Sequence, residues 1–292
     1  MSGLNTFKVK TLAGIEMPRL VYGTAWKKET TTALVMEAVR QGFRGIDTAC
    51  QPRHYREDLV GEAVDKLIQA GEIKREDIFL QTKYTPVGGQ DMKSIPYDPK
   101  APVEDQVKQS FAVSLKNLRT SYIDSLVMHS PMRTHEETMR VWRVFESFEK
   151  EGKVRQLGIS NIYDPDRLKS LYEEAEVKPS VVQNRFYPDT GYDAEIRSFC
   201  LQKGIFYQSF WTLTANPHFL KHPVTQTVAK QRNWTPQQAF FRFVMDLGIT
   251  PLTGTTDSTH MKEDLESITA PSLQSEEFKT LEKMLDPSFY RR

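Results

Sequence analysis

The sequence predicts a (β/α)8 TIM barrel, and three observations carry that prediction. Eight short apolar segments rich in β-branched and aromatic residues alternate with segments whose apolar residues recur every three or four positions. Strict strand and helix alternation implies parallel pairing through right-handed crossovers, and eight parallel strands close a barrel. No G-x-G-x-x-G follows the first strand, so the motif of the rival fold, a doubly wound open sheet, is missing.

The expected strands leave room for a helix between each successive pair. They are residues 19–25, 43–49, 77–84, 122–130, 154–161, 180–186, 205–211 and 249–255. Helical periodicity is clearest at 30–42, 57–71, 103–119 and 136–152. Several of these helical segments end on glycine, the usual helix stop, which supports the strand and helix boundaries.

Three segments fall outside this repeat. Residues 7–18 have the pattern of a hairpin, which we expect to cap the bottom of the barrel, and residues 275–285 predict an extra C-terminal helix. Residues 85–102 form an unusually long connection that is rich in turn-forming residues. Because it follows a strand end, we expect this long loop to form a wall of the substrate site.

Composition favours one globular domain over residues 1–292, because 39% hydrophobic residues in 292 suit a single large barrel. With 39 basic and 38 acidic residues, no global charge draws the protein to nucleic acid or to an anionic membrane. Cys50 and Cys200 are expected to be free thiols in a reducing compartment. No signal-peptide core or run of ~20 apolar residues is present, so we expect a cytoplasmic protein, and no metal site.

Three chemically capable side chains stand where expected strands end, which is where barrels of this class display catalytic groups. They are Asp47, Lys83 and His129. A carboxylate at the end of an apolar strand needs a cation opposite it, and Lys83 is the natural partner of Asp47. Such a pair can also be purely structural, and His129 alone can be an ordinary core histidine.

Tyr55, in the loop after the second strand, supplies a hydroxyl that can donate a proton to a carbonyl oxygen. A phenol has a pKa near 10, and a nearby ammonium such as Lys83 is expected to lower that pKa and ease proton donation. His129 is suited to orient the carbonyl through a hydrogen bond. His54, beside Tyr55, is a secondary candidate for the proton donor.

The segment GIDTACQPRHYREDLVGEAV resembles the aldo-keto reductases, and the resemblance extends across the whole barrel. It implies a tetrad of Asp47, Tyr55, Lys83 and His129. In that family the aspartate and tyrosine usually stand five positions apart, whereas Tyr55 follows Asp47 by eight and Pro52 takes the usual place. A short insertion before the tyrosine can be absorbed by bulging of the loop.

The resemblance also implies the residues that hold a nicotinamide cofactor. GISN and VVQN give Ser160, Asn161 and Gln183, whose polar groups suit the nicotinamide carboxamide. Phe210 is expected to stack on the ring, unless it is an ordinary core aromatic. The remaining residues implied at this part of the site are Gly23, Thr24, Asp47, Trp211, Thr212 and Leu213.

The phosphate end departs from the family. By register from Glu263 and Asp264, which match the family's adenine-contacting pair, Gly254 replaces a lysine, Thr255 a serine and His260 an arginine. Backbone N–H groups at 254–256, with the hydroxyls of Thr255 and Thr256, and the start of the following helix can still bind an anion, although a plain turn is the alternative. The resemblance therefore implies NADPH, with weakened selectivity over NADH.

We therefore expect an NAD(P)H-dependent reductase of aldehydes or ketones. Trp26, Tyr55, His129 and Trp211 are expected to contact a small-molecule carbonyl substrate. Two alternatives remain: a catalytically slow cofactor-binding regulatory subunit like the channel-associated β subunits that share this fold, and a barrel enzyme without nicotinamide. The substrate and the oligomeric state do not follow from the sequence.

Overall fold

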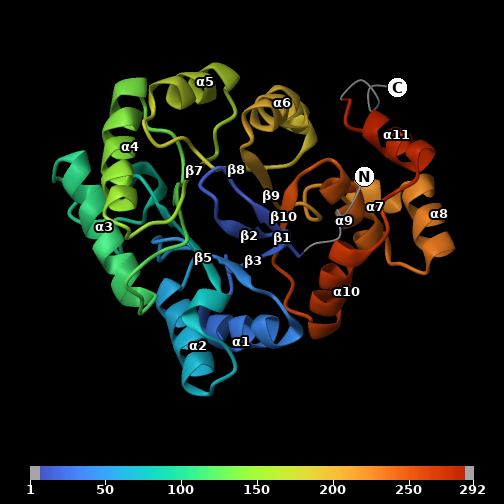
Figure 1. The fold of residues 1–292 in the computed structure, drawn as a ribbon, viewed down its shortest axis with the longest axis horizontal. Coiled ribbons are helices and arrows are strands. Elements are labelled where there is room, and N and C mark those ends of the chain that lie inside the picture. The colour runs from blue at the N-terminus through green and yellow to red at the C-terminus, as the bar shows by residue number, and fades with distance from the viewer. Residues whose placement is uncertain (1–6, 287–292) are drawn as a thin grey trace.

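The computed structural model describes residues 7–286 and contains a closed barrel of eight parallel strands surrounded by helices, as Figure 1 shows. The predicted (β/α)8 fold is confirmed. Around the barrel the strands follow the order β10-β3-β4-β5-β6-β7-β8-β9. Their bounds are β3 Val21–Gly23, β4 Gly45–Asp47, β5 Phe79–Tyr84, β6 Ser125–Met128, β7 Leu157–Ser160, β8 Val181–Arg185, β9 Phe206–Phe210 and β10 Thr250–Thr253.

The outer layer of helices follows the chain around the barrel. In sequence order the helices are α1 Thr31–Gln41, α2 Glu57–Gln69, α3 Val103–Asn117, α4 His135–Lys150, α5 Pro165–Glu174, α6 Ala194–Lys203, α7 Pro217–Lys221, α8 Pro223–Arg232, α9 Pro236–Asp246, α10 Ser258–Thr269 and α11 Ser275–Lys283. Short 3-10 turns occur at Lys28–Thr30, Arg75–Asp77, Val87–Gly89 and Pro188–Asp193. The predicted extra C-terminal helix is therefore confirmed as α11.

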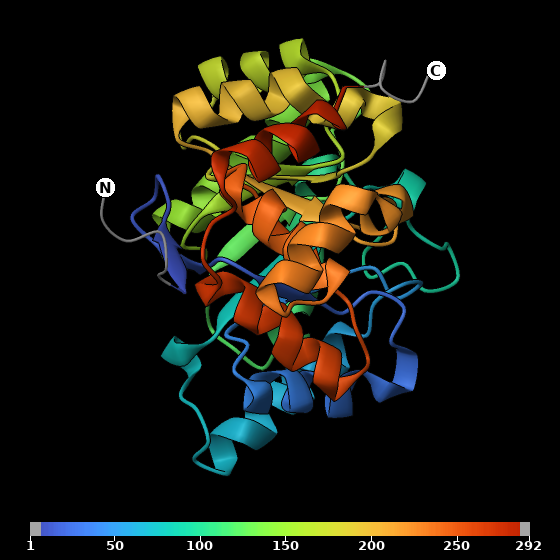
Figure 2. The same ribbon diagram turned by 90° about the vertical axis from the view of Figure 1, so that its right-hand side faces the viewer.

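The N-terminal hairpin, β1 Lys8–Lys10 and β2 Glu16–Pro18, closes the bottom of the barrel as predicted. Met17 packs with Phe79 and Val181, which stand at the N-terminal ends of β5 and β8. In the side view of Figure 2 the hairpin lies at the left edge of the barrel. The opposite end of the barrel is therefore left free for the loops that follow the strands.

One glycine explains how closely two of the helices approach each other. A Cβ atom on Gly61 of α2 would stand 1.9 Å from the backbone oxygen of Asn117, at the end of α3. No side chain fits in that gap. Since α2 begins two residues after Tyr55, this contact also fixes where the Tyr55 loop rejoins the helical layer.

The barrel interior is polar at its centre. Gln81 donates hydrogen bonds to Asp47 and to Gln208, and Gln183 donates to the same two partners, with distances of 2.7 to 2.9 Å. All four side chains are buried. Every one of these polar groups is hydrogen-bonded, so the layer ties four strands together without leaving an unpaired charge.

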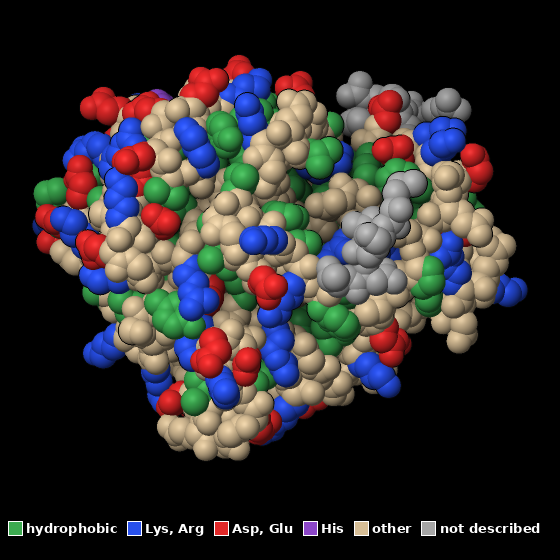
Figure 3. Space-filling model, in the orientation of Figure 1, with side chains coloured by type: hydrophobic (Ala, Val, Ile, Leu, Met, Phe, Trp, Pro, Cys, Tyr) green, Lys and Arg blue, Asp and Glu red, His purple; other side chains and the backbone are tan. Residues whose placement is uncertain are grey.

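The surface is of mixed charge. Figure 3 shows basic and acidic side chains intermingled on the face that carries the hairpin. Among residues 7–286, no helix has both the length and the apolar character needed to cross a bilayer. Cys50 and Cys200 are both buried and unpaired, in agreement with the predicted free thiols.

Candidate active site

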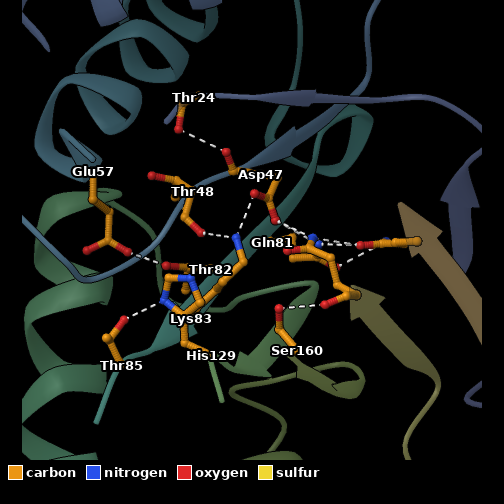
Figure 4. Close-up of polar contacts among 12 residues, drawn as sticks. Thr24, Asp47, Thr48, Glu57, Gln81, Thr82, Lys83, Thr85, His129 and Ser160 are labelled. Atoms are coloured by element: carbon orange, nitrogen blue, oxygen red, sulfur yellow. Dashed lines mark hydrogen bonds and ion pairs between the residues drawn. The ribbon is translucent and has the colours of Figure 1, made fainter. Parts of the chain in front are cut away.

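The centre of the site is a buried ion pair between β4 and β5 (Figure 4). Lys83 Nζ lies 2.6 Å from Asp47 Oδ2 and donates a second hydrogen bond, at 2.9 Å, to the backbone oxygen of Thr48. Gln81 and Gln183 donate to the other carboxylate oxygen, Oδ1. The carboxylate is therefore paired on both oxygens, which is the condition for keeping a charge in the interior.

The loop after β4 brings Tyr55 to this pair. The backbone N–H groups of His54 and Tyr55 both donate to the oxygen of Gln51, so the residues that separate Tyr55 from Asp47 are taken up in a tight turn. The ring of Tyr55 lies 5.3 Å from Lys83 Nζ and 6.0 Å from the His129 ring, measured to ring centroids. The unusual spacing thus still places the tyrosine at the ion pair.

The expected lowering of the tyrosine pKa by Lys83 is contradicted. Burial raises the pKa of Tyr55 well above its usual value, and the negative charge of Asp47 raises it further. The physical reason is that the positive charge of Lys83 is largely compensated by the Asp47 carboxylate. The Nζ atom of Lys83 donates hydrogen bonds to that carboxylate and to the backbone oxygen of Thr48. The phenol therefore stays protonated through neutral pH and keeps its proton available.

His129 is a neutral hydrogen-bonding group. Burial, together with the nearby charge of Lys83, lowers its pKa to about 3. Its Nδ1 lies 2.6 Å from the Thr85 hydroxyl. When the Thr85 hydroxyl donates to Nδ1, the ring proton is on Nε2, the atom that remains to donate toward the cavity.

One large cavity joins these groups to the residues expected at the cofactor. It has a volume of about 760 Å³ and opens at the C-terminal ends of the strands. The predicted residues that line it are Gly23, Trp26, Asp47, Tyr55, His129, Ser160, Asn161, Gln183, Phe210, Trp211, Thr212, Leu213, Gly254, Thr255, His260, Glu263 and Asp264. The barrel thus brings together groups that are more than two hundred residues apart in sequence.

Three predicted residues do not line this cavity. Lys83 lies behind Asp47, and Thr24 is buried with its hydroxyl donating to the backbone oxygen of Asp47. Thr256 is exposed and outside the lining. Thr24 therefore reaches the cavity through Asp47, whereas Lys83 contacts both Asp47 and the ring of Tyr55.

The nicotinamide side of the cavity is formed by β7, β8 and β9. The Ser160 hydroxyl donates to the backbone oxygen of Gln183, and the Asn161 amide donates to the backbone oxygen of His129. Phe210 faces the cavity at the end of β9 and is only partly buried. Phe210 and these polar residues line the same cavity, so the residues present offer the aromatic face and the polar partners that fit a nicotinamide.

The phosphate end is poor in positive charge. The helix α10 begins at Ser258 as predicted, but its N-terminus is capped by the carboxylate of Asp257, which accepts from the N–H of His260. Asp264 is buried nearby, and burial raises its pKa to about 7. The Asp257 carboxylate opposes an added phosphate, because it already places a negative charge at the end of the helix that attracts anions. Asp264, in the middle of α10, adds a negative charge to the cavity lining when it is ionised.

Lys27 is a cation at this end that sequence reasoning missed. Its Nζ donates a 2.6 Å hydrogen bond to the backbone oxygen of Gly254 and lies 3.8 Å from the position of a Cβ on that glycine. Burial lowers the pKa of Lys27 to about 8. Lys27 follows β3, which is the neighbour of β10 in the barrel. Its side chain can therefore lie in the space beside Gly254 that a longer side chain at position 254 would fill.

Lys27 is not among the residues that line the cavity, but several lining residues were not assigned to the site from the sequence, or only as a secondary candidate. His54, the secondary candidate, lines the cavity, but its ring stacks on Trp26 at the rim, with centroids 3.9 Å apart. Arg185 stands two residues beyond Gln183 on β8, and the alternation of side chains along a strand was the signal that could have found it. The others are Ala25, Gln51, Thr214, Gln237, Phe241, Leu252 and Thr253.

Three rim residues have an unusual backbone conformation. Trp26, Asn161 and Trp211 have φ angles of 64°, 52° and 56°. These values lie in the left-handed region, which residues other than glycine rarely adopt. All three line the cavity. Trp26 and Trp211 are 58% and 48% exposed, so their rings stand at the mouth rather than in the core.

The expectation that loop 85–102 walls the substrate site is wrong. None of the residues that line the cavity comes from this loop. Instead Gln90 donates to the backbone oxygens of Cys50 and Thr85, and Gly89 accepts from the side chain of Gln51. Loop 85–102 therefore packs against the loop that carries Tyr55, on the side away from the cavity, and stabilises that loop.

Known proteins resemble this chain in sequence and in fold. The chain is 28% identical to the glyoxal reductase of Bacillus subtilis, covering 82% of this chain and 79% of the relative. It is 25% identical to a glycerol 2-dehydrogenase (NADP(+)) of Hypocrea jecorina, covering 93% and 89%. A crystal structure of an aldo/keto reductase from Brucella melitensis superimposes with a TM-score of 0.79 at 28% identity, covering 96% and 99%.

The barrel, the cavity at its C-terminal end and these likenesses agree with a family model. Residues 19–218, which include Asp47, Tyr55, Lys83 and His129, match the model of the aldo/keto reductase family. The chain belongs to the aldo/keto reductase family.

Proposed function

We propose that this protein reduces an aldehyde or ketone to the alcohol, with NADPH as cofactor and NADH as a weaker substitute. The observation that carries the proposal is that Tyr55 and His129 face the same cavity as Ser160, Asn161, Gln183 and Phe210. The proton donor and the nicotinamide side thus line one cavity. When bound, the nicotinamide supplies the hydride that adds to the carbonyl carbon.

The proposed role of Tyr55 is to donate its hydroxyl proton to the carbonyl oxygen as hydride reaches the carbon. The phenol, whose pKa lies above its usual value, is protonated at neutral pH and so carries the proton to be transferred. The neutral His129 donates from Nε2 to the same oxygen and orients the carbonyl. The ammonium of Lys83, 5.3 Å from the Tyr55 ring, stabilises the negative charge that develops there.

NADPH is proposed from family membership, and the name of the Hypocrea relative, which specifies NADP(+), supports it. Lys27, His260 and the backbone at Gly254 and Thr255 are the groups proposed to receive the extra phosphate. The carboxylates of Asp257 and Asp264 are the reason for weak selectivity. We also propose that residues 1–292 form one domain and that the protein is cytoplasmic.

Replacing Tyr55 by phenylalanine tests the reaction. Loss of an acid catalyst should lower kcat by about 10² to 10⁴, while the Kd for NADPH, measured by tryptophan quenching, should stay within a few fold. Tyr122→Phe is the matched control, because Tyr122 stacks between Arg75 and Arg155 outside the cavity. Unchanged turnover in the Tyr55 variant would sink the assignment.

One observation favours the second candidate, a slow cofactor-binding regulatory subunit. Within the described residues no hydrogen bond joins Lys83 to the Tyr55 hydroxyl, and the tyrosine pKa is raised rather than lowered. Single-turnover oxidation of bound NADPH on mixing with an aldehyde separates the two. A rate comparable to kcat supports the enzyme, and oxidation over minutes supports the regulatory subunit.

A further inference from the structure

Arg185 is a cavity-lining cation with no counter-charge. It is the last residue of β8, it is partly buried, and its Nε atom is buried without a hydrogen-bond partner among residues 7–286. No ion pair of the described residues includes its guanidinium. Among residues 7–286 none of the five N–H donors of this side chain has an acceptor, so they are free to bind a ligand that enters the cavity.

Two aromatic rings hold this guanidinium in place. Its central carbon lies 4.1 Å from the centroid of the Trp211 ring and 5.0 Å from that of Tyr187. Such contacts fix the plane of the group without using its hydrogen-bond donors. The Arg185 side chain is therefore pre-organised, so its guanidinium N–H groups are already oriented when a planar anion binds.

The place of Arg185 in the barrel puts it on the substrate's path. Side chains alternate along a strand, so Arg185 shares the inward face of Gln183 one layer closer to the mouth. In the barrel order β8 stands four strands from β4, so it lies opposite the strand that precedes Tyr55. A substrate whose carbonyl meets Tyr55 and His129 can reach across the cavity to Arg185.

We propose that Arg185 binds a carboxylate of the substrate, so that the enzyme prefers carbonyl compounds that carry a carboxylate group. This inference rests on the carbonyl reduction proposed above and names its substrate class. A carboxylate is favoured because its two oxygens match two parallel N–H groups of a guanidinium. The phosphate end is elsewhere, at β10 and β3, where Lys27 and Gly254 meet.

The test compares two aldehydes that differ in charge. 4-Carboxybenzaldehyde and methyl 4-formylbenzoate share the same reacting group and ring, and only the first is an anion. The wild-type protein should have the higher kcat/KM for the acid, mainly through a lower KM. In Arg185→Met the ratio of the two kcat/KM values should fall about 10- to 100-fold, and Arg185→Lys should recover part of it.

Arg53→Met is the matched control. Arg53 is an exposed arginine beside His54 on the loop at the mouth, and it does not line the cavity. Its removal should leave the ratio within about twofold. An equal fall in Arg53→Met would show that only the general field of the mouth attracts anions, and it would overturn the proposal.

Two further outcomes overturn it. An acid-to-ester ratio that survives in Arg185→Met shows that the arginine does not bind the carboxylate. A rise in the Kd for NADPH equal to the loss in the ratio shows that Arg185 is a ligand of the cofactor instead.

Binding separates this inference from the proposed reaction. If wild-type protein reduces neither aldehyde, the proposed reduction fails, and calorimetric titration with 4-(hydroxymethyl)benzoate still decides the role of Arg185. Binding at least tenfold weaker in Arg185→Met supports an anion site, and equal binding overturns it.

Discussion

The two ends of the cavity are built in opposite ways. At the tetrad end, Asp47 and Lys83 form a buried ion pair at 2.6 Å that glutamines of neighbouring strands complete. At the phosphate end, Gly254 and His260 are exposed, and Lys27, a buried cation, donates to a backbone oxygen instead of pairing with a carboxylate of the described residues. The difference teaches that the groups proposed for the reaction are held by the barrel interior, whereas the groups proposed for cofactor selectivity are a few side chains in loops.

The largest expected effect comes from breaking the tetrad end. Lys83→Met leaves the Asp47 carboxylate buried without its partner and should lower the free energy of unfolding by about 3 to 5 kcal/mol. Arg40→Met, which breaks the exposed Arg40–Glu72 pair, should lower it by no more than about 1 kcal/mol. Urea unfolding of both variants measures the contrast. Equal losses would mean that the interior pair is no more important than a surface one.

At the phosphate end we expect an effect on binding and not on folding. Lys27→Met should raise the Kd for NADPH by about tenfold or more, because a charged hydrogen-bond donor is removed, and should change the Kd for NADH much less. Lys28→Met, at the exposed neighbouring lysine, is the control. Tryptophan quenching titrations measure both cofactors. Parallel losses for NADPH and NADH would contradict a role at the extra phosphate.

The same end should make NADPH binding sensitive to pH. Lys27, with a pKa of about 8, loses its positive charge as pH rises, and Asp264, with a pKa of about 7, gains a negative one. Both changes oppose a phosphate, so the Kd for NADPH should increase several-fold between pH 6 and 9, with a smaller change for NADH. Asp264→Asn should remove the lower part of this dependence and Lys27→Met the upper part. A flat profile in wild-type protein would contradict both assignments.

The smallest expected effect sharpens the contrast. Asp257→Asn keeps a side-chain oxygen for the N–H of His260 but removes a negative charge from the start of α10. Removing that charge should tighten NADPH binding by about two- to fivefold, the size of a helix-terminus interaction. Asp164→Asn, at the matching cap of α5, should have no such effect. Weaker NADPH binding in Asp257→Asn would show that Asp257 holds the site in shape.

Sequence patterns predicted the parts of the molecule that depend on local rules. Strand ends are visible as apolar runs, so the placement of Asp47, Lys83 and His129 followed directly. Gln81 and Gln208 were missed, although each lies two residues before a site residue, Lys83 and Phe210, and so shares its face. A polar residue inside an apolar strand was the signal.

Other features depend on contacts between distant segments and had no local signal. Lys27 meets Gly254 across more than two hundred residues of sequence, and nothing near either residue indicates the contact. The length of loop 85–102 correctly indicated an unusual segment, but it did not indicate which side of the Tyr55 loop this segment would contact. The side chain of Gln90 turns the loop toward Cys50, and that choice is made by hydrogen bonds in the folded state. That residues 1–292 form one domain stays a prediction, since residues 1–6 and 287–292 lie outside those described.

The left-handed backbone at Trp26, Asn161 and Trp211 has a consequence for how this protein can change. Each such residue costs about 1 kcal/mol or more, which the surrounding barrel must hold in place. Glycine at these three positions would relax the chain, so selection for thermal tolerance alone would favour it. It would also strip the rings and the amide from the mouth. Selection for higher thermal stability and selection for higher substrate selectivity would therefore favour different residues at these three positions.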